Sequence, residues 1–338
     1  MLDVYELNVF LTAAETENFS EAARQLNLTQ PAVSMQIRAL ERKLDVQLFH
    51  RSGRSLTLSE RGKALLPLAR DVVNRAIRIE EEIESLKGEV VGHLKIGCST
   101  ATGKYILPHL AARFRRRHPA VQMSIINHSR DIVLSEMCDG TVQLAVVSST
   151  PVCKDITYRQ FFTDYLVLIV PADHAWAKRE MISPEELQGT DFILRDQESG
   201  TRDEMESALR EFGLGIEDLN VVMELGNSEA ISMAVEEGIG VAFVSRAVAR
   251  RGIELGRIKE VKVAGISLRR EIYIVYSNRH PATRAQSEFW NFVTQPPMEQ
   301  FMEEFSRTGI LPSFESALSN QVNGLQPQQV LGSIAEPA

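Results

Sequence analysis

The stretch FSEAARQLNLTQPAVSMQIRALER, residues 19–42, decides how the first domain folds. Its first part, which Ser20 can cap, consists mostly of good helix formers, and Asn27 interrupts them. Thr29 can then cap a second helix. Pro31 is compatible with the first turn of that helix, because an N–H in the first turn has no partner within the helix. Since the small alanines at positions 22 and 23 let two helices cross closely, this stretch predicts a helix-turn-helix.

The second helix should present a polar face once its apolar residues pack inward. Val33, Ile37 and Leu40 share one side of it, at the spacing of a buried stripe. The opposite side carries hydrogen-bonding and basic groups of the kind that read base edges in a major groove. The candidate DNA-binding residues of this helix are Thr29, Gln30, Pro31, Ser34, Met35 and Arg38. An ordinary helical hairpin with a solvated outer face is the alternative interpretation.

The residues that follow favour DNA binding over that alternative. FHRSGRSLTL, residues 49–58, is typical of a hairpin with a glycine turn, and Arg51 and Arg54 lie at its tip as further candidate DNA contacts. Between Arg38 and Lys63 the chain has seven basic and three acidic residues, although its net charge is −8. A basic island in an acidic protein is the electrostatic mark of phosphate contact. We therefore expect a winged helix-turn-helix that binds double-stranded DNA.

Residues 22–62, AARQLNLTQPAVSMQIRALERKLDVQLFHRSGRSLTLSERG, resemble the LysR-type transcriptional regulators, and the resemblance extends more loosely to about residue 295. It implies an effector domain of two lobes, similar to periplasmic binding proteins, with the effector bound between them. It also implies a homodimer that assembles as a dimer of dimers, with RNA polymerase as a further candidate partner. Met35 and Arg61 depart from the family pattern, in which a polar or basic residue and a small residue are commoner at these places.

Residues 58–86 predict a long helix with a narrow apolar seam. Apolar or small residues recur there at alternating spacings of four and three: Leu58, Gly62, Leu65, Ala69, Val72, Ala76, Ile79, Ile83 and Leu86. A heptad seam of this kind needs a partner helix to cover it. We therefore expect a homodimer formed through this helix. Packing on its own domain, which usually needs a broader apolar stripe, is the alternative.

The length and composition bound the remaining possibilities. A chain of 338 residues indicates two or three domains, and 44% hydrophobic with 24% charged residues is typical of a soluble globular protein. No apolar run reaches the length of a bilayer, and the N-terminus lacks the basic start of a signal peptide. We expect a cytoplasmic protein with no membrane partner. Because the histidines show no metal-binding spacing, neither a metal nor a cofactor is expected.

Three cysteines are too few for a disulfide framework, and an odd number cannot all pair with one another, so we expect free thiols. A redox-sensing regulator that uses Cys98, Cys138 or Cys153 remains the alternative to a ligand-sensing one. No neighbouring residue in the sequence visibly lowers the pKa of any of these thiols.

Past the glycines at positions 88 and 92 the pattern changes to alternating strands and helices, which predicts an α/β domain with a mostly parallel sheet. The predicted parts are the winged helix-turn-helix at 1–58, the linker and dimerisation helix at 59–88, the effector domain at 89–297, and an extension at 298–338. Lobe 1 of the effector domain should span about 92–163 and 267–297, and lobe 2 about 164–266. We expect the extension to start with a short amphipathic helix and to be largely disordered beyond it, since it is rich in Pro and Gln.

Three corners between predicted strands and helices carry hydroxyl groups and glycines: residues 97–103, 148–150 and 199–202. In open α/β sheets such corners meet at one edge, where helix N-termini offer N–H groups to anions. The candidate effector-binding residues are Ser99, Thr100, Thr102, Ser148, Ser149, Thr201, Arg202 and Asn227. Helix capping explains any one corner, but three together favour a small anion: an organic acid, a phosphorylated acid or a sulfur-containing anion.

Two other classes of function fit the sequence less well. The chain lacks the nucleophile elbow, the P-loop and the G-x-G-x-x-G pattern of common α/β enzymes, so we expect no enzyme activity and assign no catalytic residue. A transport protein could use the same two lobes, but the DNA-binding segment argues against it.

Overall fold

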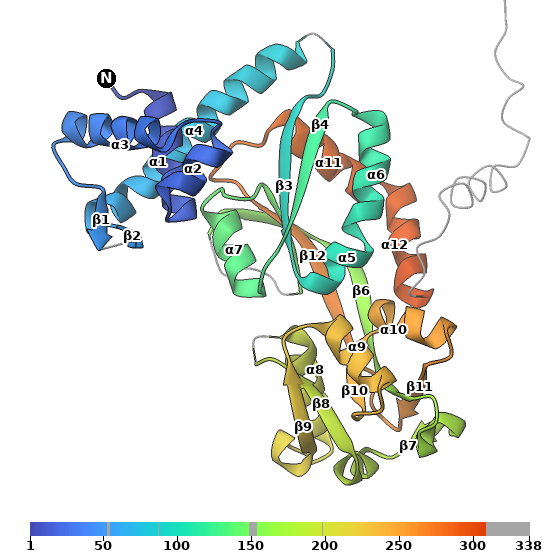
Figure 1. Ribbon diagram of the computed structural model, residues 1–338. Helices are drawn as coiled ribbons and strands as arrows, with labels where there is room; N and C mark the ends of the chain where they lie inside the picture. The colour runs from blue at the N-terminus through green and yellow to red at the C-terminus, as the bar shows by residue number, and fades with distance from the viewer. Residues whose placement is uncertain (53–54, 87, 149–153, 198, 309–338) are drawn as a thin grey trace, which may run out of the picture.

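The computed structural model describes residues 1–52, 55–86, 88–148, 154–197 and 199–308. Figure 1 shows a small helical domain with a hairpin, then the long helix α4, then an α/β region of two lobes joined by extended strands. The predicted fold class, a winged helix-turn-helix followed by a long helix and a two-lobed α/β domain, is confirmed. Among the described helices, none combines the length and the apolar composition that crossing a bilayer requires.

The N-terminal domain packs three helices and a hairpin around one core: α1 (Val4–Thr16), α2 (Phe19–Gln25), α3 (Gln30–Leu44), β1 (Phe49–Ser52) and β2 (Ser55–Leu58). The ring of Phe49 lies 5.6 Å from that of Phe10 and 5.5 Å from that of Phe19. The wing is therefore anchored to α1 and α2 by aromatic packing, which contributes beyond simple burial.

The prediction that Ser20 caps the first helix of the motif is wrong. Asn18 is the N-cap of α2, and its side chain accepts hydrogen bonds from the amides of Ser20 and Glu21 at 2.8 and 3.2 Å. The prediction for the second helix is confirmed, since Thr29 caps α3 and accepts from the amide of Ala32 at 3.4 Å.

Helix α4 (Glu60–Ser85) is fixed to the wing at its start. The Ser59 hydroxyl donates to the carbonyl of Gln47 at 2.6 Å and accepts from the amide of Gly62 at 3.0 Å. A side chain at Gly62 would stand 2.3 Å from the carbonyl oxygen of Leu48, so only glycine allows this approach. The helix and the DNA-binding domain thus form one packed unit.

The predicted seam divides into two halves. In the first half Ala69, together with its neighbour Val73, is buried against the N-terminal domain. In the second half Val72, Ile79, Ile83 and Leu86 are 43%, 63%, 59% and 82% exposed. The alternative of packing on its own domain therefore holds for the start of α4, while its later turns leave large apolar side chains uncovered.

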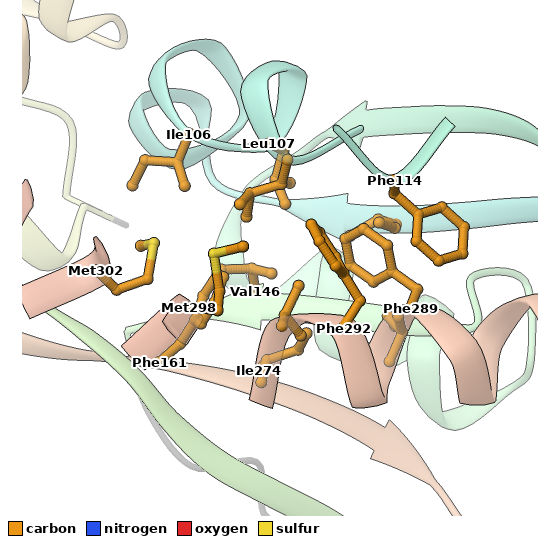
Figure 2. Packing of buried hydrophobic residues seen from close by; sticks show 14 of the residues in the cluster. Ile106, Leu107, Phe114, Val146, Phe161, Ile274, Phe289, Phe292, Met298 and Met302 are labelled. Carbon is orange, nitrogen blue, oxygen red and sulfur yellow. The ribbon is translucent and has the colours of Figure 1, made fainter. Parts of the chain in front are cut away.

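Lobe 1 is built on the strand order β4-β3-β5-β12-β6, with helices on both faces of the sheet. Its shorter elements are β3 (Gly92–Cys98), α5 (Thr100–Tyr105), α6 (Leu107–Arg117), β4 (Val121–Asn127), α7 (Arg130–Cys138), β5 (Leu144–Val147), α11 (Arg284–Thr294) and α12 (Pro296–Thr308). Figure 2 shows its core, in which Phe114 of α6 and Phe289 of α11 stack edge to face at 5.1 Å.

Two long strands, β6 (Ile156–Pro171) and β12 (Arg269–Ser277), run side by side and connect the lobes. Lobe 2 adds β7 (Met181–Ile182), β8 (Asp191–Arg195), α8 (Gly200–Glu211), β9 (Asn220–Leu225), α9 (Ser228–Glu236), β10 (Ala242–Ser245), α10 (Arg246–Glu254) and β11 (Ile258–Val263). Short 3₁₀ helices at Ala175–Lys178, Pro184–Gly189 and Ile216–Asp218 complete it.

The sheet is mixed, not mostly parallel as the alternating pattern predicted. Among the described strands, parallel pairing is limited to β3 with β4 and β5, β7 with β11, and β8 with β9. The long strand β6 pairs antiparallel with β12, β10 and β11. The chain passes from lobe 1 to lobe 2 along β6 and returns along β12. Because these two strands lie next to each other, they pair antiparallel.

The first residues of the C-terminal extension belong to the core of lobe 1. Helix α12 buries Met298, Phe301, Met302 and Phe305, and the Phe305 ring lies 5.7 Å from that of Phe162 on β6. The Ser306 hydroxyl accepts a hydrogen bond from the amide of Thr163 at 3.1 Å. Helix α12, which follows the boundary predicted at residue 297, thus packs its apolar residues into the core of lobe 1. Residues 309–338 lie outside the described part of the chain.

Candidate functional site

The outward face of α3 carries the polar residues predicted to contact DNA. Thr29, Gln30, Pro31 and Arg38 are exposed, and Met35 is 67% exposed. Ser34 is partly buried on the same helix. Across the helix Val33, Ile37 and Leu40 are buried, as predicted. The amphipathic division of α3 thus separates a buried apolar side from a largely exposed polar one.

Two polar contacts fix the C-terminal end of α3. The Lys43 ammonium donates to both carboxylate oxygens of Glu6 on α1, at 2.7 and 2.8 Å, and Glu6 is buried. The Glu41 carboxylate accepts from the amide of Leu48 at 2.8 Å, where the chain enters the wing. Lys43, which counted toward the basic island, therefore holds α3 on α1 and is not a free phosphate contact.

A hollow beside α3 gathers basic side chains from two helices. Met35, Arg38 and Arg42 line it from α3, and Arg61 lines it from the start of α4. Arg61, one of the two departures from the family pattern, thus shares a surface with Met35, the other departure. Of the wing residues, Arg51 lies on β1, while the side chain of Arg51 and the whole of Arg54 lie outside the described residues.

A second polar cluster lies where β6 and β12 cross between the lobes. Arg270 and Asp164 are directly opposite across the two strands, and the guanidinium donates to Asp164 Oδ2 from Nε at 3.0 Å and from Nη2 at 2.8 Å. The second carboxylate oxygen of Asp164 accepts from the Ser245 hydroxyl at 2.6 Å. Both side chains of the ion pair are only 10% exposed, so solvent screens the pair weakly.

The same cluster reaches the predicted corner at the start of α8. Nη1 of Arg270 donates to the Thr201 hydroxyl at 3.2 Å. A Cβ built on Gly200 would stand 3.0 Å from the Ser148 hydroxyl and 3.4 Å from Arg270 Nη1, so lobe 1, the crossing strands and lobe 2 approach one another here. Thr201 and Ser148, two of the predicted effector residues, are thereby brought together.

Ion pairs also link the lobes on either side of this cluster. Arg130 of α7 lies 3.3 Å from Asp203 of α8, and Lys104 of α5 lies 3.1 Å from Glu229 of α9. The Arg130–Asp203 pair is partly exposed and contributes little, about 0–1 kcal/mol, whereas both carboxylate oxygens of Glu229 are buried.

Two of the predicted effector residues are committed elsewhere. The Arg202 guanidinium donates to Glu206 at 2.8 Å, to Glu224 at 3.0 Å and to the carbonyl of Arg195 at 3.0 Å, and these bonds raise its pKa, the contact with Glu206 most. It therefore fastens α8 within lobe 2. Asn227 is the N-cap of α9 and accepts from the amides of Glu229 and Ala230, so simple capping explains it.

The remaining predicted residues are placed only in part. Ser99 precedes α5 and is half-buried. Thr100 and Thr102 lie on α5, but their side chains are outside the described residues, as is Ser149 altogether. Sequence analysis missed Arg270, Asp164 and Ser245. The one signal that could have found them is the lone carboxylate in the otherwise apolar stretch FFTDYLVLIV, because a charge there needs a partner.

Cys98 gives the redox alternative little support. Cys98 is buried, donates to Asn127 Oδ1 at 3.0 Å, and burial raises the pKa of its thiol to about 12, so it stays protonated. Cys138 is disulfide-bonded, so the expectation of free thiols is wrong for it, and Cys153 lies outside the described residues. Within the part of the chain that the structure describes, histidines, cysteines and carboxylates form no group that could hold a metal ion.

A winged helix-turn-helix joined by a long helix to two hinged lobes defines a class of protein: DNA-binding regulators with a ligand-sensing domain. Residues 5–63 match the family model "Bacterial regulatory helix-turn-helix protein, lysR family", and residues 87–296 match the model "LysR substrate binding domain". The chain belongs to the LysR family of transcriptional regulators.

Relatives and solved structures agree with this assignment. The probable RuBisCO transcriptional regulator of Cyanophora paradoxa is 33% identical over 285 residues, which cover 83% of this chain and 88% of that protein. The full-length LysR-family regulator CbnR, solved with its target DNA, has a similar fold, with a TM-score of 0.62 at 20% identity, covering 86% of this chain and 99% of that one. The regulatory domain of CcmR from Synechocystis PCC6803, solved with 2-PG, has a TM-score of 0.54 at 23% identity and covers 60% of this chain and 95% of that one.

Proposed function

We propose that this LysR-family regulator reads DNA through the outward face of α3 and is switched by a small anion held between its lobes at Arg270, Thr201 and Ser148. The observation that carries the proposal is the hydrogen-bonded cluster of Arg270, Asp164 and Thr201, in which groups of the crossing strands and of lobe 2 meet. A regulator needs such a place, since a ligand must contact both moving parts to favour one arrangement over another.

DNA reading follows from the free groups on α3. Gln30 and Arg38 can donate hydrogen bonds to base edges, and the apolar Met35 suits the methyl group of thymine. Arg42 and Arg61 at the adjacent hollow are placed to contact phosphates, which position a protein without specifying sequence. The wing arginines, Arg51 and Arg54, would add phosphate contacts at the neighbouring groove.

A homodimer follows from the uncovered half of the α4 seam. Ile79, Ile83 and Leu86 lie on successive turns and are each more than half exposed. A second copy of α4 would cover them by heptad packing and would place two α3 helices for a two-fold related DNA site. The family resemblance extends this to a dimer of dimers.

The anion follows from the donors that the cluster leaves unused. Each terminal nitrogen of a guanidinium carries two N–H groups, so Nη1 and Nη2 of Arg270 each keep one for a ligand after the contacts to Thr201 and Asp164. The amide ends of α8 favour negative charge nearby. An organic acid, a phosphorylated acid or a sulfur-containing anion would fit these donors. 2-PG, with which the CcmR regulatory domain was solved, is a direct compound to test.

The test is a titration of the purified full-length protein with 2-PG, sulfate and small organic acids, followed by thermal unfolding and by binding to its own upstream DNA. We expect at least one anion to raise the unfolding temperature and to change the DNA complex. Thr201→Val should remove both effects while leaving DNA affinity without the anion unchanged. A response that survives Thr201→Val and Arg270→Met would refute the interlobe site.

A further inference from the structure

A cavity of about 170 Å³ lies between α4 and lobe 1, away from the interlobe cluster. The α4 side supplies residues from Asp71 to Glu81, and the lobe 1 side supplies residues of β3, the turn after α7, and the end of β12. The two walls also touch directly. Arg70 of α4 lies 3.1 Å from Asp139, and the Asn74 amide donates to the carbonyl of Gly140 at 3.3 Å. The cavity is therefore part of the joint that connects the DNA-binding unit to the effector domain.

The charges that line this cavity are mainly positive. Arg75, Arg78, Lys95 and Arg279 line it together with Asp71 and Glu81. Two of these arginines have carboxylate partners, because Arg78 is bonded to Glu82 at 3.0 Å and Arg279 lies 4.0 Å from Asp155. Asp71 is already paired with His280 at 3.1 Å, while within the described part of the chain neither Lys95 nor Arg75 has a carboxylate partner. The pKa of His93 is lowered by burial and then by the charge of Lys95, so the positive charge of Lys95 acts on a neighbouring side chain. An anion would offset this charge.

One buried carboxylate, that of Glu81, lines the cavity. Glu81 Oε1 accepts from the amide of His93 at 3.2 Å, and Oε2 has no partner within the described residues. Burial raises the pKa of Glu81, which favours the neutral form.

The rest of the lining is part polar, with Asn74, Gln143, Ser277, Thr283 and Gln286, and part apolar. Ile77, Met137, Val142 and Pro281 line the cavity with hydrocarbon. An engineered apolar cavity of about 150 Å³ admits benzene, so a space of 170 Å³ admits a body of about one six-membered ring. Free inorganic anions would leave this apolar part unfilled.

We propose that this cavity is a second ligand site, which binds a small monocarboxylate with a compact apolar body. The carboxylate would accept from Lys95 and Arg78, while the apolar body lies against Ile77 and Val142. Because the occupant would contact both α4 and lobe 1, it would fix the joint and so act on the placement of the DNA-binding domain without entering the interlobe cluster. The proposal stands apart from the interlobe anion site.

The test uses three probes of one shape and different charge: cyclohexanecarboxylate, cyclohexylmethanol and cyclohexylmethylamine, titrated calorimetrically into the full-length protein. We expect the carboxylate to bind most tightly. Lys95→Met should lower its affinity roughly tenfold, as the loss of a charged hydrogen bond does. Ile77→Trp should abolish binding by filling the space, and it should fold normally because Ile77 is 44% exposed on the helix surface. Arg270→Met, which alters the interlobe cluster, should leave the affinity unchanged.

Opposite results would overturn this site. Equal or tighter binding of the amine would exclude an anion site. Carboxylate affinity that is unchanged in both Lys95→Met and Ile77→Trp would place the probe elsewhere. Loss of carboxylate binding in Arg270→Met, with retention in Ile77→Trp, would assign the probe to the interlobe cluster instead. If Lys95→Met proves unstable, Ile77→Trp decides the question by itself.

Discussion

The exposed face of α3, which we propose contacts DNA, and the interlobe cluster are both polar, but their polar groups are bonded in different ways. On α3, Arg38 is exposed and its guanidinium has no carboxylate partner within the described residues. Between the lobes, Arg270 and Asp164 are each 10% exposed and bonded to each other. One surface offers free groups on a rigid helix, whereas the other offers groups that are already satisfied.

This difference separates two properties, the affinity for DNA and the response of the lobes to a ligand. Free groups bind a duplex with no internal contact to break, so α3 can act as a fixed reader. A ligand at the interlobe cluster must share or replace existing hydrogen bonds, so its binding energy depends on how the lobes are arranged. A ligand shifts a conformational equilibrium only through such a difference in affinity.

The largest effect on stability should come from a change in the core of lobe 1. Phe301→Ala deletes a ring of α12 that is fully buried in the core of lobe 1, over which the Arg113 guanidinium lies at 4.1 Å. We expect a loss of about 3–5 kcal/mol in the free energy of unfolding, measured by denaturant titration. DNA binding by the protein that remains folded should persist, because the N-terminal domain has its own core.

The matched control is Glu303→Ala, an exposed position two residues along the same helix. It should leave the unfolding midpoint within experimental error. A midpoint for Phe301→Ala equal to that of the control would mean that α12 does not belong to the core of lobe 1.

The second effect tests the hydrogen-bonded cluster of Arg270, Asp164 and Thr201 between the lobes. Asp164→Asn removes the charge that neutralises Arg270, and breaking a buried pair in this way costs about 3 kcal/mol of stability. Arg270 then carries an uncompensated charge, so anions that bind between the lobes should bind more tightly and restore part of the lost stability. Thermal unfolding with and without sulfate measures both effects.

A double variant provides the control for this change. Asp164→Asn combined with Arg270→Met removes both charges, so the added affinity for sulfate should disappear. If sulfate stabilises the single and the double variants equally, the anion does not use Arg270.

The third effect tests the reader. Arg38→Ala should weaken DNA binding roughly tenfold or more, with a shallower salt dependence if the contact is to phosphate and relaxed sequence preference if it is to a base. Fluorescence anisotropy at several salt concentrations separates the two. Arg24→Ala is the control, since Arg24 is equally exposed but is paired with Glu21 on α2. Equal losses in the two variants would argue for a general charge effect and against reading by α3.

The same comparison explains what could be predicted from the sequence. The helix-turn-helix rests on local signals, such as the Thr29 cap and the apolar spacing of α3, and these need no knowledge of distant residues. Even the error at Ser20 is local, because Asn18 offered a stronger cap two residues earlier. The split seam of α4 follows the same logic, since periodicity shows that a stripe is apolar but not which surface covers it.

The interlobe cluster depends on contacts between distant residues. Arg270 meets Asp164 across 106 positions and Thr201 across 69. No periodicity links such residues, and only the pairing of β6 with β12 brings them together. Arg202 shows the converse, because the corner at residues 199–202 suggested a ligand contact while neighbouring carboxylates on lobe 2 already bind its guanidinium.

The smallest effect concerns Glu81, which combines features of both regions: it is buried, yet one of its oxygens has no partner within the described residues. The groups around it are His93 and Lys95 on β3 and Arg78 on its own helix. Burial raises its pKa above the usual 4.5, an effect only partly offset by the hydrogen bond from the His93 amide. The stability that this raised pKa contributes is present below about pH 4.5 and is lost as the pH rises through the pKa of the folded state.

Glu81→Gln removes the ionisation and keeps the shape. Its free energy of unfolding should match that of the unchanged protein at pH 4 and exceed it by about 1 kcal/mol at pH 8, because the buried charge is then absent. Denaturant titrations across this range measure the difference, with Glu82→Gln, its exposed neighbour, as the control. A difference that does not grow with pH would show that the Glu81 carboxylate is well solvated in the folded protein, and the joint between α4 and lobe 1 would then have to be more open than the packing of Gly92 against Glu81 indicates.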